Sequence, residues 1–222
     1  MNLWITREKS INALESKLSI ESRYIEKGFT IIDTLLHLFE ENNTDIFCRV
    51  CSIVLLKGKN LCFSIYSLTL DGLAQEAGAI LRPAIECFEL LDYFSADPER
   101  IQEALENKLP SPGNIAKKIN GKHKKIREYL NSTASHFLLN PMACTHLINW
   151  KKGSLRYYQE YNENVLRKNL WTLFCIIVFL IYSVYRCSTF NKLIDRKLAK
   201  EIEEWKVSGL KLAEEDIFMK CK

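Results

Sequence analysis

Residues 61–93, which read LCFSIYSLTLDGLAQEAGAILRPAIECFELLDY, form the longest stretch of helical periodicity in the chain. On a wheel of about 100° per residue, the second half of this stretch has one broad apolar face. That face carries Leu73, Ala77, Ile80, Leu81, Ala84, Ile85, Phe88 and Leu91. We therefore expect one long helix that packs this face into the core of the protein.

The opposite side of the same helix is polar and carries Arg82, Glu86, Glu89 and Tyr93. Arg82 and Glu86 stand four residues apart, so they can pair along the helix, and a solvated strip is the simplest interpretation. Pro83 follows Arg82, and a proline inside a helix removes a hydrogen bond and usually produces a kink. Such a kink would either aim Arg82 or only curve the helix around the core.

The rest of the chain predicts an all-α protein. It contains only 8 glycines and 5 prolines among 222 residues, which is few turn signals for a many-stranded β protein. Amphipathic patterns and cap signals predict helices at residues 2–26, 29–41, 45–56, 61–94, 98–108, 112–130, 141–150, 154–186 and 191–219, with a turn at 57–60. We expect a single-domain helical bundle of about seven to nine helices over residues 1–222, with its core in 29–190 and a C-terminal amphipathic helix in 191–222.

The cysteines and the N-terminal residues indicate a cytoplasmic protein with reduced thiols. Eight cysteines would suit a disulfide-rich secreted chain, but residues 1–21 lack the features of a signal peptide. Cys48 and Cys51 have the spacing of half a zinc site, yet no second pair and no suitably spaced histidine accompanies them. We expect buried thiols there and predict no metal. No cofactor is predicted either, because the chain contains none of the glycine-rich phosphate-binding motifs.

Residues 170–185, LWTLFCIIVFLIYSVY, are the one candidate for a membrane span in the sequence. The stretch is 16 residues long, whereas a spanning helix needs about 20 apolar residues. It also includes Thr172 and Ser183. We expect a helix of the protein core, with a membrane-associated effector as the less favoured alternative.

Two short motifs carry a resemblance to a known family. The first is Glu76-Ala77, four residues, Arg82, three residues and Glu86, and the second places Tyr129 and Ser132 ahead of His136. Together they resemble the bacterial helical family catalogued as domain of unknown function 5677, over about residues 60–190. The family pattern Tyr-x-x-Leu-Ser is one residue longer than its counterpart here, where Asn131 stands in place of leucine. The family is similar in outline to the HEPN superfamily of helical toxins and ribonucleases.

The resemblance implies a bundle in which the Arg82 and Glu86 element packs near the Ser132 and His136 element to form a polar centre. In such a centre His136 could act as general acid or base, with Arg82 or Arg127 stabilising a phosphoryl transition state and Ser132 orienting the group. HEPN ribonucleases place arginine and histidine closer together than Arg127 and His136, which have eight residues between them. A structural histidine is the alternative.

Two clusters are candidates for nucleic-acid binding. Residues 117–127, KKINGKHKKIR, contain Lys117, Lys118, Lys122, Lys124 and Lys125, and such a run could neutralise backbone phosphates. A second cluster combines basic with aromatic side chains: Trp150, Lys151, Lys152, Arg156, Tyr157, Tyr158 and Tyr161. Aromatic rings there could stack bases. The alternatives are a solvated helix end with a turn at Asn120-Gly121 for the first cluster and helix surface plus core for the second.

The leading expectation is a helical-bundle protein that acts through protein or nucleic-acid contacts in a bacterial cytosol, with phage defence as one setting. Its partner would be RNA or another protein. A HEPN-like, metal-independent ribonuclease is the first alternative and a membrane-associated effector the second. Apolar positions left over on the first and last helices are compatible with a homodimer.

Overall fold

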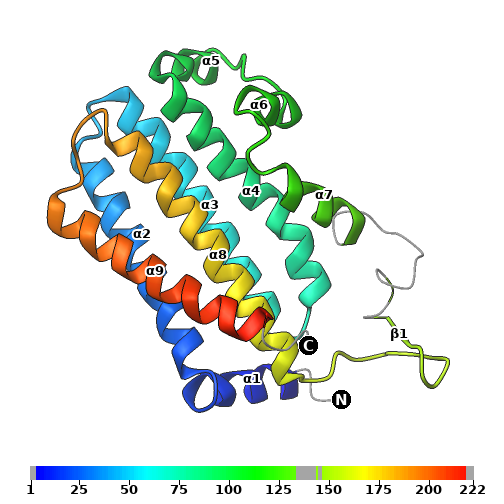
Figure 1. Ribbon diagram of the computed structural model, residues 1–222. Coiled ribbons are helices and arrows are strands. Elements are labelled where there is room, and N and C mark those ends of the chain that lie inside the picture. The colour runs from blue at the N-terminus through cyan, green and yellow to red at the C-terminus, as the bar shows by residue number, and fades with distance from the viewer. Residues whose placement is uncertain (1–3, 134–143, 145–146, 219–222) are drawn as a thin grey trace.

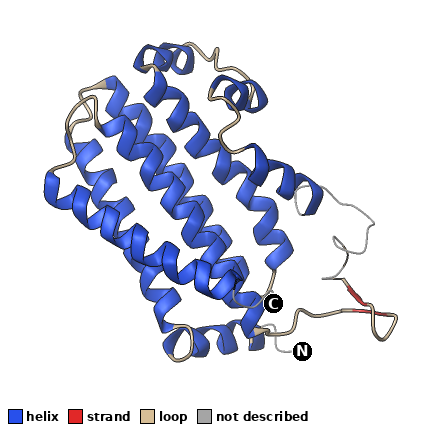
Figure 2. Cartoon of the chain, in the orientation of Figure 1, coloured by secondary structure: helices blue, strands red, loops and turns tan. Residues whose placement is uncertain are grey.

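The computed structural model describes residues 4–133, 144 and 147–218, and these residues form nine α-helices, one short 3-10 helix and a two-stranded antiparallel sheet (Figure 1, Figure 2). The α-helices are α1 (Ile5–Glu15), α2 (Ser19–Glu41), α3 (Ile46–Leu70), α4 (Ala74–Ala96), α5 (Ile101–Leu105), α6 (Pro112–Lys118), α7 (Lys124–Thr133), α8 (Glu163–Ser188) and α9 (Arg196–Phe218). The 3-10 helix is Pro98–Arg100, and the strands are β1 (Ile148–Asn149) and β2 (Ser154–Leu155). The predicted all-α helical bundle is confirmed.

Helix α8 is the central element, with α2, α3 and α4 packed against it and α9 crossing its outer side (Figure 1). Its buried residues extend along most of its length and include Trp171, Phe174 and Ile177. Among the described residues, α8 is also the one helix long and apolar enough to cross a membrane, and most of its apolar window is buried inside the bundle. This burial agrees with the prediction of a core helix in residues 170–185.

Two buried glycines set how closely α9 approaches the bundle. A β-carbon on Gly209 would overlap the ring of Phe174, and one on Gly28 would lie 2.9 Å from the ring of Trp205. The indole N–H of Trp205 donates a hydrogen bond to the carbonyl of Tyr24 on α2, at 3.0 Å. Helix α9 therefore packs closely on the bundle because Phe174 lies against Gly209 and Trp205 lies against Gly28.

The stretch 61–93 is not one helix, and this corrects the prediction. Helix α3 ends at Leu70 and α4 begins at Ala74, because Gly72 adopts a left-handed conformation with φ of 78° and reverses the chain. The guanidinium of Arg7 holds Asp71 at this turn through two contacts of 2.6 Å. The polar and apolar faces of residues 74–94 are therefore carried by a separate helix that packs beside α3.

Conversely, the turn predicted at residues 57–60 lies within α3. Gly58 occurs there because α8 approaches closely: a β-carbon would stand 2.8 Å from a methyl carbon of Leu180. Gly58 is therefore required by helix packing and not by a turn. Its neighbours Lys57 and Lys59 in the sequence do not indicate this. Helix α4 also continues through Pro83.

Other predicted boundaries are wrong where a local break interrupts a helical pattern. The predicted helix 2–26 is divided between α1 and α2, and the predicted helix 112–130 between α6 and α7. Asn120 and Gly121 both have positive φ at the second break, which a helix does not tolerate. Residues 148–149 form a strand where a helix was predicted at 141–150, and α8 begins at Glu163, capped by the side chain of Asn162, where a helix from residue 154 was predicted.

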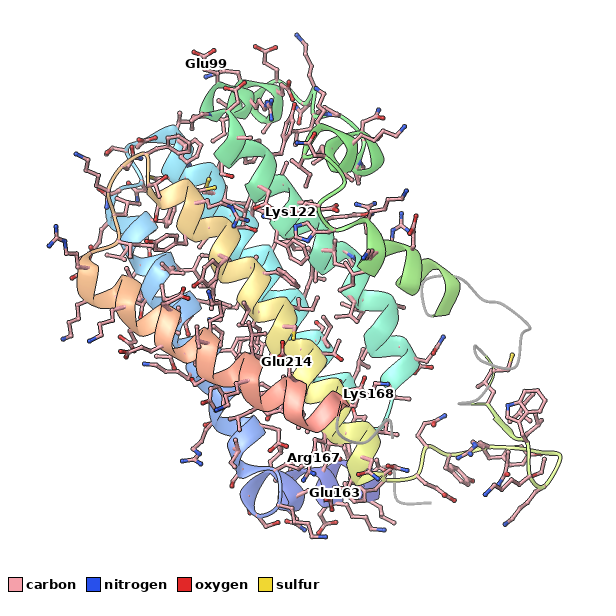
Figure 3. All side chains as sticks on the ribbon, in the orientation of Figure 1. Glu99, Lys122, Glu163, Arg167, Lys168 and Glu214 are labelled. Atoms are coloured by element: carbon pink, nitrogen blue, oxygen red, sulfur yellow. The ribbon has the colours of Figure 1, made fainter. Side chains whose placement is uncertain are left out.

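At its start, α8 is fixed to α2 by charge (Figure 3). Arg167 contacts Glu21 of α2 at 3.0 Å and Glu163 of its own first turn at 3.6 Å. Glu21 is buried, so this pair lies beneath the surface of the bundle. It positions the segment that leads from the hairpin into α8.

Candidate functional site

The polar side of α4 is covered by other helices and is not the solvated strip that was predicted. Glu89 is 1% exposed and Tyr93 is fully buried, because α6 and α7 pack over this side of α4. Asp92, one turn further along, is 5% exposed. Glu89 and Asp92 therefore lie at an interface inside the molecule, with the partly buried Glu86 at its edge, and the buried charges require partners.

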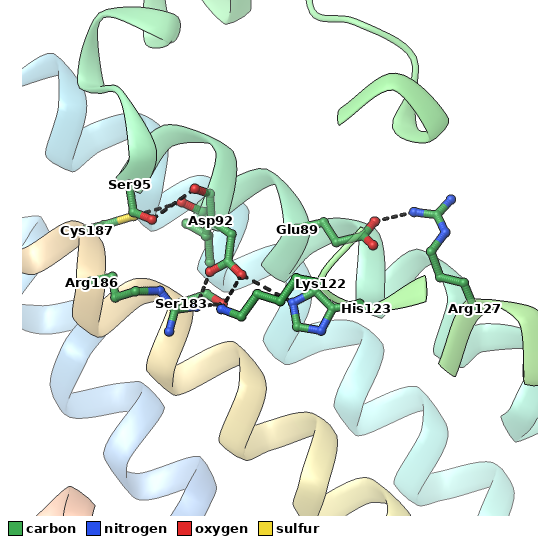
Figure 4. A network of polar contacts seen from close by, with 10 residues as sticks. Glu89, Asp92, Ser95, Lys122, His123, Arg127, Ser183, Arg186 and Cys187 are labelled. Atoms are coloured by element: carbon green, nitrogen blue, oxygen red, sulfur yellow. Dashed lines mark hydrogen bonds and ion pairs between the residues drawn. The ribbon is translucent and has the colours of Figure 1, made fainter. Parts of the chain in front are cut away.

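Asp92 is the centre of a network that joins three elements (Figure 4). Its Oδ2 lies 2.9 Å from Nζ of Lys122 and 3.2 Å from Nε2 of His123, both in the turn between α6 and α7. Its Oδ1 accepts a hydrogen bond from Arg186 of α8, and that guanidinium also donates to Ser183 at 3.0 Å. Burial alone would raise the pKa of Asp92, but hydrogen bonds from these partners outweigh it and hold the pKa well below its usual range.

His123 is part of the core. Its ring meets Phe88 of α4 and Phe179 of α8 at centroid distances of 4.7 and 5.4 Å, both edge-to-face. His123 belongs to the basic run that was predicted to bind nucleic acid, and Asp92, Ser183 and Arg186 were not predicted as site residues. One signal was available: Glu86, Glu89 and Asp92 recur every three residues inside an apolar stretch, which indicates a shared, partnered face.

A second group of charges lies one turn away. Arg127 of α7 pairs with Glu89, and its Nη2 lies 3.8 Å from Oε1 of Glu86. The same Oε1 is 3.5 Å from Nε of Arg82. Burial raises the pKa of Glu89 above its usual range, and Arg127 offsets only part of that shift. Consistent with this, Oε1 of Glu89 is buried without a hydrogen-bond partner among the described residues.

Of the five predicted catalytic residues, three come together. Arg82, Glu86 and Arg127 form the linked pairs just described. Ser132 belongs to α7, but its side chain lies outside the described part of the chain, as does the whole of His136. Helix α7 lies on α4. The predicted packing of the Arg82 and Glu86 element near the Ser132 and His136 element stays a prediction, since it falls in part outside the described residues. The catalytic roles of these residues stay predictions.

The basic run 117–127 divides into two sets of side chains. Lys118 donates to the hydroxyl of Tyr93 at 3.1 Å, and Lys122 pairs with Asp92, so both contribute to the interface with α4. All five predicted lysines of the run are exposed. Lys118 and Lys122 therefore contact α4 while remaining open to solvent, and Lys124 lies 3.6 Å from Glu128 of its own helix.

The second basic cluster lies on a β-hairpin that projects from the bundle on the same side as α7 (Figure 1). We call residues 147–161 the hairpin arm. Strands β1 and β2 pair Ile148 with Leu155, and Gly153, at φ of 61°, closes the connecting turn. Lys151 and Lys152 lie in this turn and are exposed.

The arm carries large aromatic side chains that the bundle does not cover. Trp150 is 53% exposed and Tyr157 is 80% exposed, and Tyr158 is exposed beside it. Tyr161, by contrast, packs against the core. The base of the arm is attached to α1, where the Thr6 hydroxyl donates to the carbonyl of Gln159 at 2.9 Å. The arm is thus an anchored strip of exposed rings and positive charges.

The cysteines of the helical bundle are free thiols, and all of them except the partly exposed Cys175 are buried. Cys48 and Cys51 are buried thiols, as predicted, and burial raises the pKa of the Cys62 thiol to about 12. Within the described residues, no group of three or more histidine, cysteine or acidic side chains is arranged to hold a metal ion.

The two candidate sites differ in what they can do. Where α4 packs against α7 and α8, cations and carboxylates pair with one another, so these charges connect the three helices and are not free to bind a ligand. The arm offers rings and lysines to a ligand. Comparisons with protein-family models, curated proteins and solved structures give no match.

Proposed function

We propose that the protein binds single-stranded RNA through the hairpin arm, with the exposed lysines of α6 and α7 extending the contact. The observation that carries this proposal is the combination of exposed Trp150 and Tyr157 with Lys151 and Lys152 on one anchored hairpin. Aromatic rings stack on unpaired bases of any sequence, and lysines neutralise the backbone between them. The exposed rings favour a single strand over a duplex, because the bases of a duplex are already stacked on one another and are not free to stack on a protein side chain.

The aromatic side chains favour this function over a purely structural role for the arm. Exposing a large ring to water forgoes about 1.5–3 kcal/mol of burial, and three such rings stand within nine residues of one another. Tyr161 of the same arm packs against the core of the bundle, whereas these three rings do not. Their exposure next to Lys151, Lys152 and Arg156 fits a ligand that is both planar and anionic.

The test is fluorescence anisotropy of a labelled single-stranded RNA titrated with the full chain. Base stacking contributes about 1–3 kcal/mol per aromatic residue, so Trp150→Ala and Tyr157→Ala should each weaken binding by roughly 5- to 150-fold. The same oligonucleotide made as DNA, and a duplex RNA, serve as competitors. We expect the duplex to compete least, because it offers charge without accessible base faces.

A matched control is available on α9, where Lys197 and Lys200 are exposed and distant in sequence from the arm. Replacing both by alanine should leave affinity within about two-fold of the parent. Absence of binding at low salt would refute the proposal. So would equal losses in the α9 control and in a Lys151→Ala, Lys152→Ala variant, because binding would then be non-specific attraction.

A HEPN-like ribonuclease activity is the second candidate. It is favoured by the convergence of Arg82 and Arg127 on Glu86, beside the helix that leads through Ser132 toward His136. Incubation of labelled RNA with the parent and with His136→Ala, both in EDTA, tests it. Cleavage by the parent alone supports this activity, whereas equal cleavage or none in both would exclude it.

A further inference from the structure

One face of α3 is largely uncovered by the rest of the described chain, although at one end the ring of Phe63 stacks on Phe29 of α2 with centroids 4.2 Å apart. Helices α2 and α4 flank α3 and α8 packs across it, which leaves the fourth side open. That side carries the α3 stripe, defined as Ile46, Arg49, Ile53, Leu56, Asn60 and Phe63, all of them exposed. Ile53 and Leu56 in the middle are 61% and 48% exposed.

The spacing of the stripe is that of a helix–helix seam. Its positions alternate by three and four residues, which keeps them in one row along about 26 Å of helix. Single exposed apolar residues are ordinary on protein surfaces, but four in one row, with Arg49 and Asn60 between them, indicate an interaction surface. Beside the row, between α2 and α3, lies a hollow of about 370 Å³ lined in part by Leu36, Ile53 and Leu56.

The chemistry of the stripe is symmetric about a point between Val54 and Leu55. Going outward from that point, Ile53 matches Leu56, Arg49 matches Asn60, and Ile46 matches Phe63. If two copies of α3 packed antiparallel about a two-fold axis there, these matched positions would lie opposite each other. Apolar side chains would then meet apolar ones in two layers and polar would meet polar in the third. A second copy of the same helix is therefore a partner that this row fits.

Charges beside the stripe are complementary in the same arrangement. Helix α2 runs antiparallel along α3, with Asp33 paired to Lys59 and Glu40 beside the hollow together with Ser52. The two-fold operation brings Glu40 of one copy level with the turn of Lys59 in the other, and Asp33 level with Arg49. Opposite charges thus face each other along the α2 edge, which fixes the register of an interface.

We infer that the protein forms a two-fold symmetric homodimer through the α3 stripe, with the two α3 helices antiparallel. The inference rests on the open face of α3 and is independent of RNA binding by the hairpin arm. The seam is small compared with an obligate interface, so association should depend on concentration. Lys57 lies on the α4 side of the stripe. In the dimer it approaches Lys57 of the second copy across the two-fold axis, and this like-charge contact opposes association.

Sedimentation equilibrium of the full chain over a roughly hundred-fold range of concentrations tests the dimer. We expect the parent to pass from monomer to dimer and Leu56→Glu to stay monomeric with an unchanged circular dichroism spectrum. Val207→Glu, at an exposed apolar position on α9, is the matched control and should dimerise like the parent. A parent that stays monomeric throughout, or loss of the dimer in Val207→Glu but not in Leu56→Glu, would overturn the inference.

The orientation is tested separately with Ile46→Cys and Phe63→Cys. Treated with a short bismaleimide, an equimolar mixture of the two variants should give a covalent dimer, whereas neither variant alone should exceed the parent. A parallel pairing gives the opposite result. Lys57→Ser should strengthen association by several-fold in the antiparallel arrangement, because it removes a like-charge contact. No strengthening together with self-cross-linking of the single variants would contradict the antiparallel dimer.

Discussion

Asp92 and Glu89 are acidic residues one turn apart on α4, and their surroundings act on them in opposite ways. Asp92 receives hydrogen bonds from helix α8 and from the turn between α6 and α7, so its ionised form is stabilised. Glu89 is as deeply buried but pairs through one oxygen, so burial dominates and its pKa rises. The sequence indicates that this face is partnered but not by which residues, because the partners lie about 30 to 95 residues away.

Replacing Asp92 by asparagine keeps the shape and removes the charge that Lys122 and Arg186 share. Breaking a buried pair by removing one partner costs about 3–5 kcal/mol, and the partial exposure of both cations brings our expectation to the lower end, about 3 kcal/mol at neutral pH. Urea unfolding followed by circular dichroism measures it. A loss below about 0.5 kcal/mol, typical of a surface substitution, would contradict the network.

The pH dependence of this loss has a definite sign. Because the pKa of Asp92 is lowered, its contribution is present above the ordinary aspartate value of 3.8 and is lost as the pH falls through the lower folded value. The difference in unfolding free energy between the parent and Asp92→Asn should therefore shrink in acid. A difference that stays constant down to the acid limit of folding would show that charge is not the cause.

Glu89→Gln should behave differently. Because the pKa of Glu89 is raised from 4.5, its ionised form is penalised at neutral pH, and the penalty is relieved as the pH falls through the folded value. A neutral isostere removes that penalty together with the pairing to Arg127, so we expect a net change under about 1 kcal/mol at neutral pH. Urea unfolding in the same buffer compares it with Asp92→Asn, and an equally large loss would refute the contrast.

At the scale of elements, the sequence predicted helices well and their ends poorly. Periodicity identified the apolar faces of α4 and α8, because burial of one face repeats at every turn. It failed at Gly58 and Gly72, which look alike in sequence. One is a close contact with Leu180 and the other a reversal of the chain, and the difference depends on which helix lies nearby. The overlooked break at residues 16–18 has the same origin, whereas a turn at Asn120-Gly121 was the alternative interpretation of the basic run and is present.

The docking of α9 provides a test at this scale. Gly209→Ala places a methyl group into the ring of Phe174, and overpacking of this kind costs about 1–3 kcal/mol. We expect a lower midpoint of thermal unfolding and faster hydrogen exchange confined to α9. Gly113→Ala is the control, since a β-carbon there meets nothing within 4 Å. Equal behaviour of the two variants would mean that α9 does not depend on this close approach.

At the scale of the whole molecule, composition and pattern sufficed for the fold class but not for the site. Few turn signals and long amphipathic stretches indicate a bundle whatever the connections are. Three residues of the predicted site, Arg82, Glu86 and Arg127, do meet, whereas Asp92, His123 and Arg186 were overlooked as site residues. The predicted polar centre with Ser132 and His136 stays a prediction. Whether the aromatic side chains of the arm are exposed depends on how the rest of the chain packs, so the basic and aromatic sequence of the arm alone did not predict it. The open face of α3 was not predictable for the same reason.

The salt dependence of RNA binding tests the central proposal most directly. For single strands the slope of log K against log salt changes by about 0.7 for each phosphate contact, so a Lys151→Ala, Lys152→Ala variant that loses two contacts should have a slope shallower by about 1.4. Anisotropy titrations of parent and variant at several salt concentrations give both slopes. We predict that shallower slope, with the Lys197→Ala, Lys200→Ala control parallel to the parent. Identical slopes in all three proteins, or no binding at any salt concentration, would contradict RNA binding through the hairpin arm.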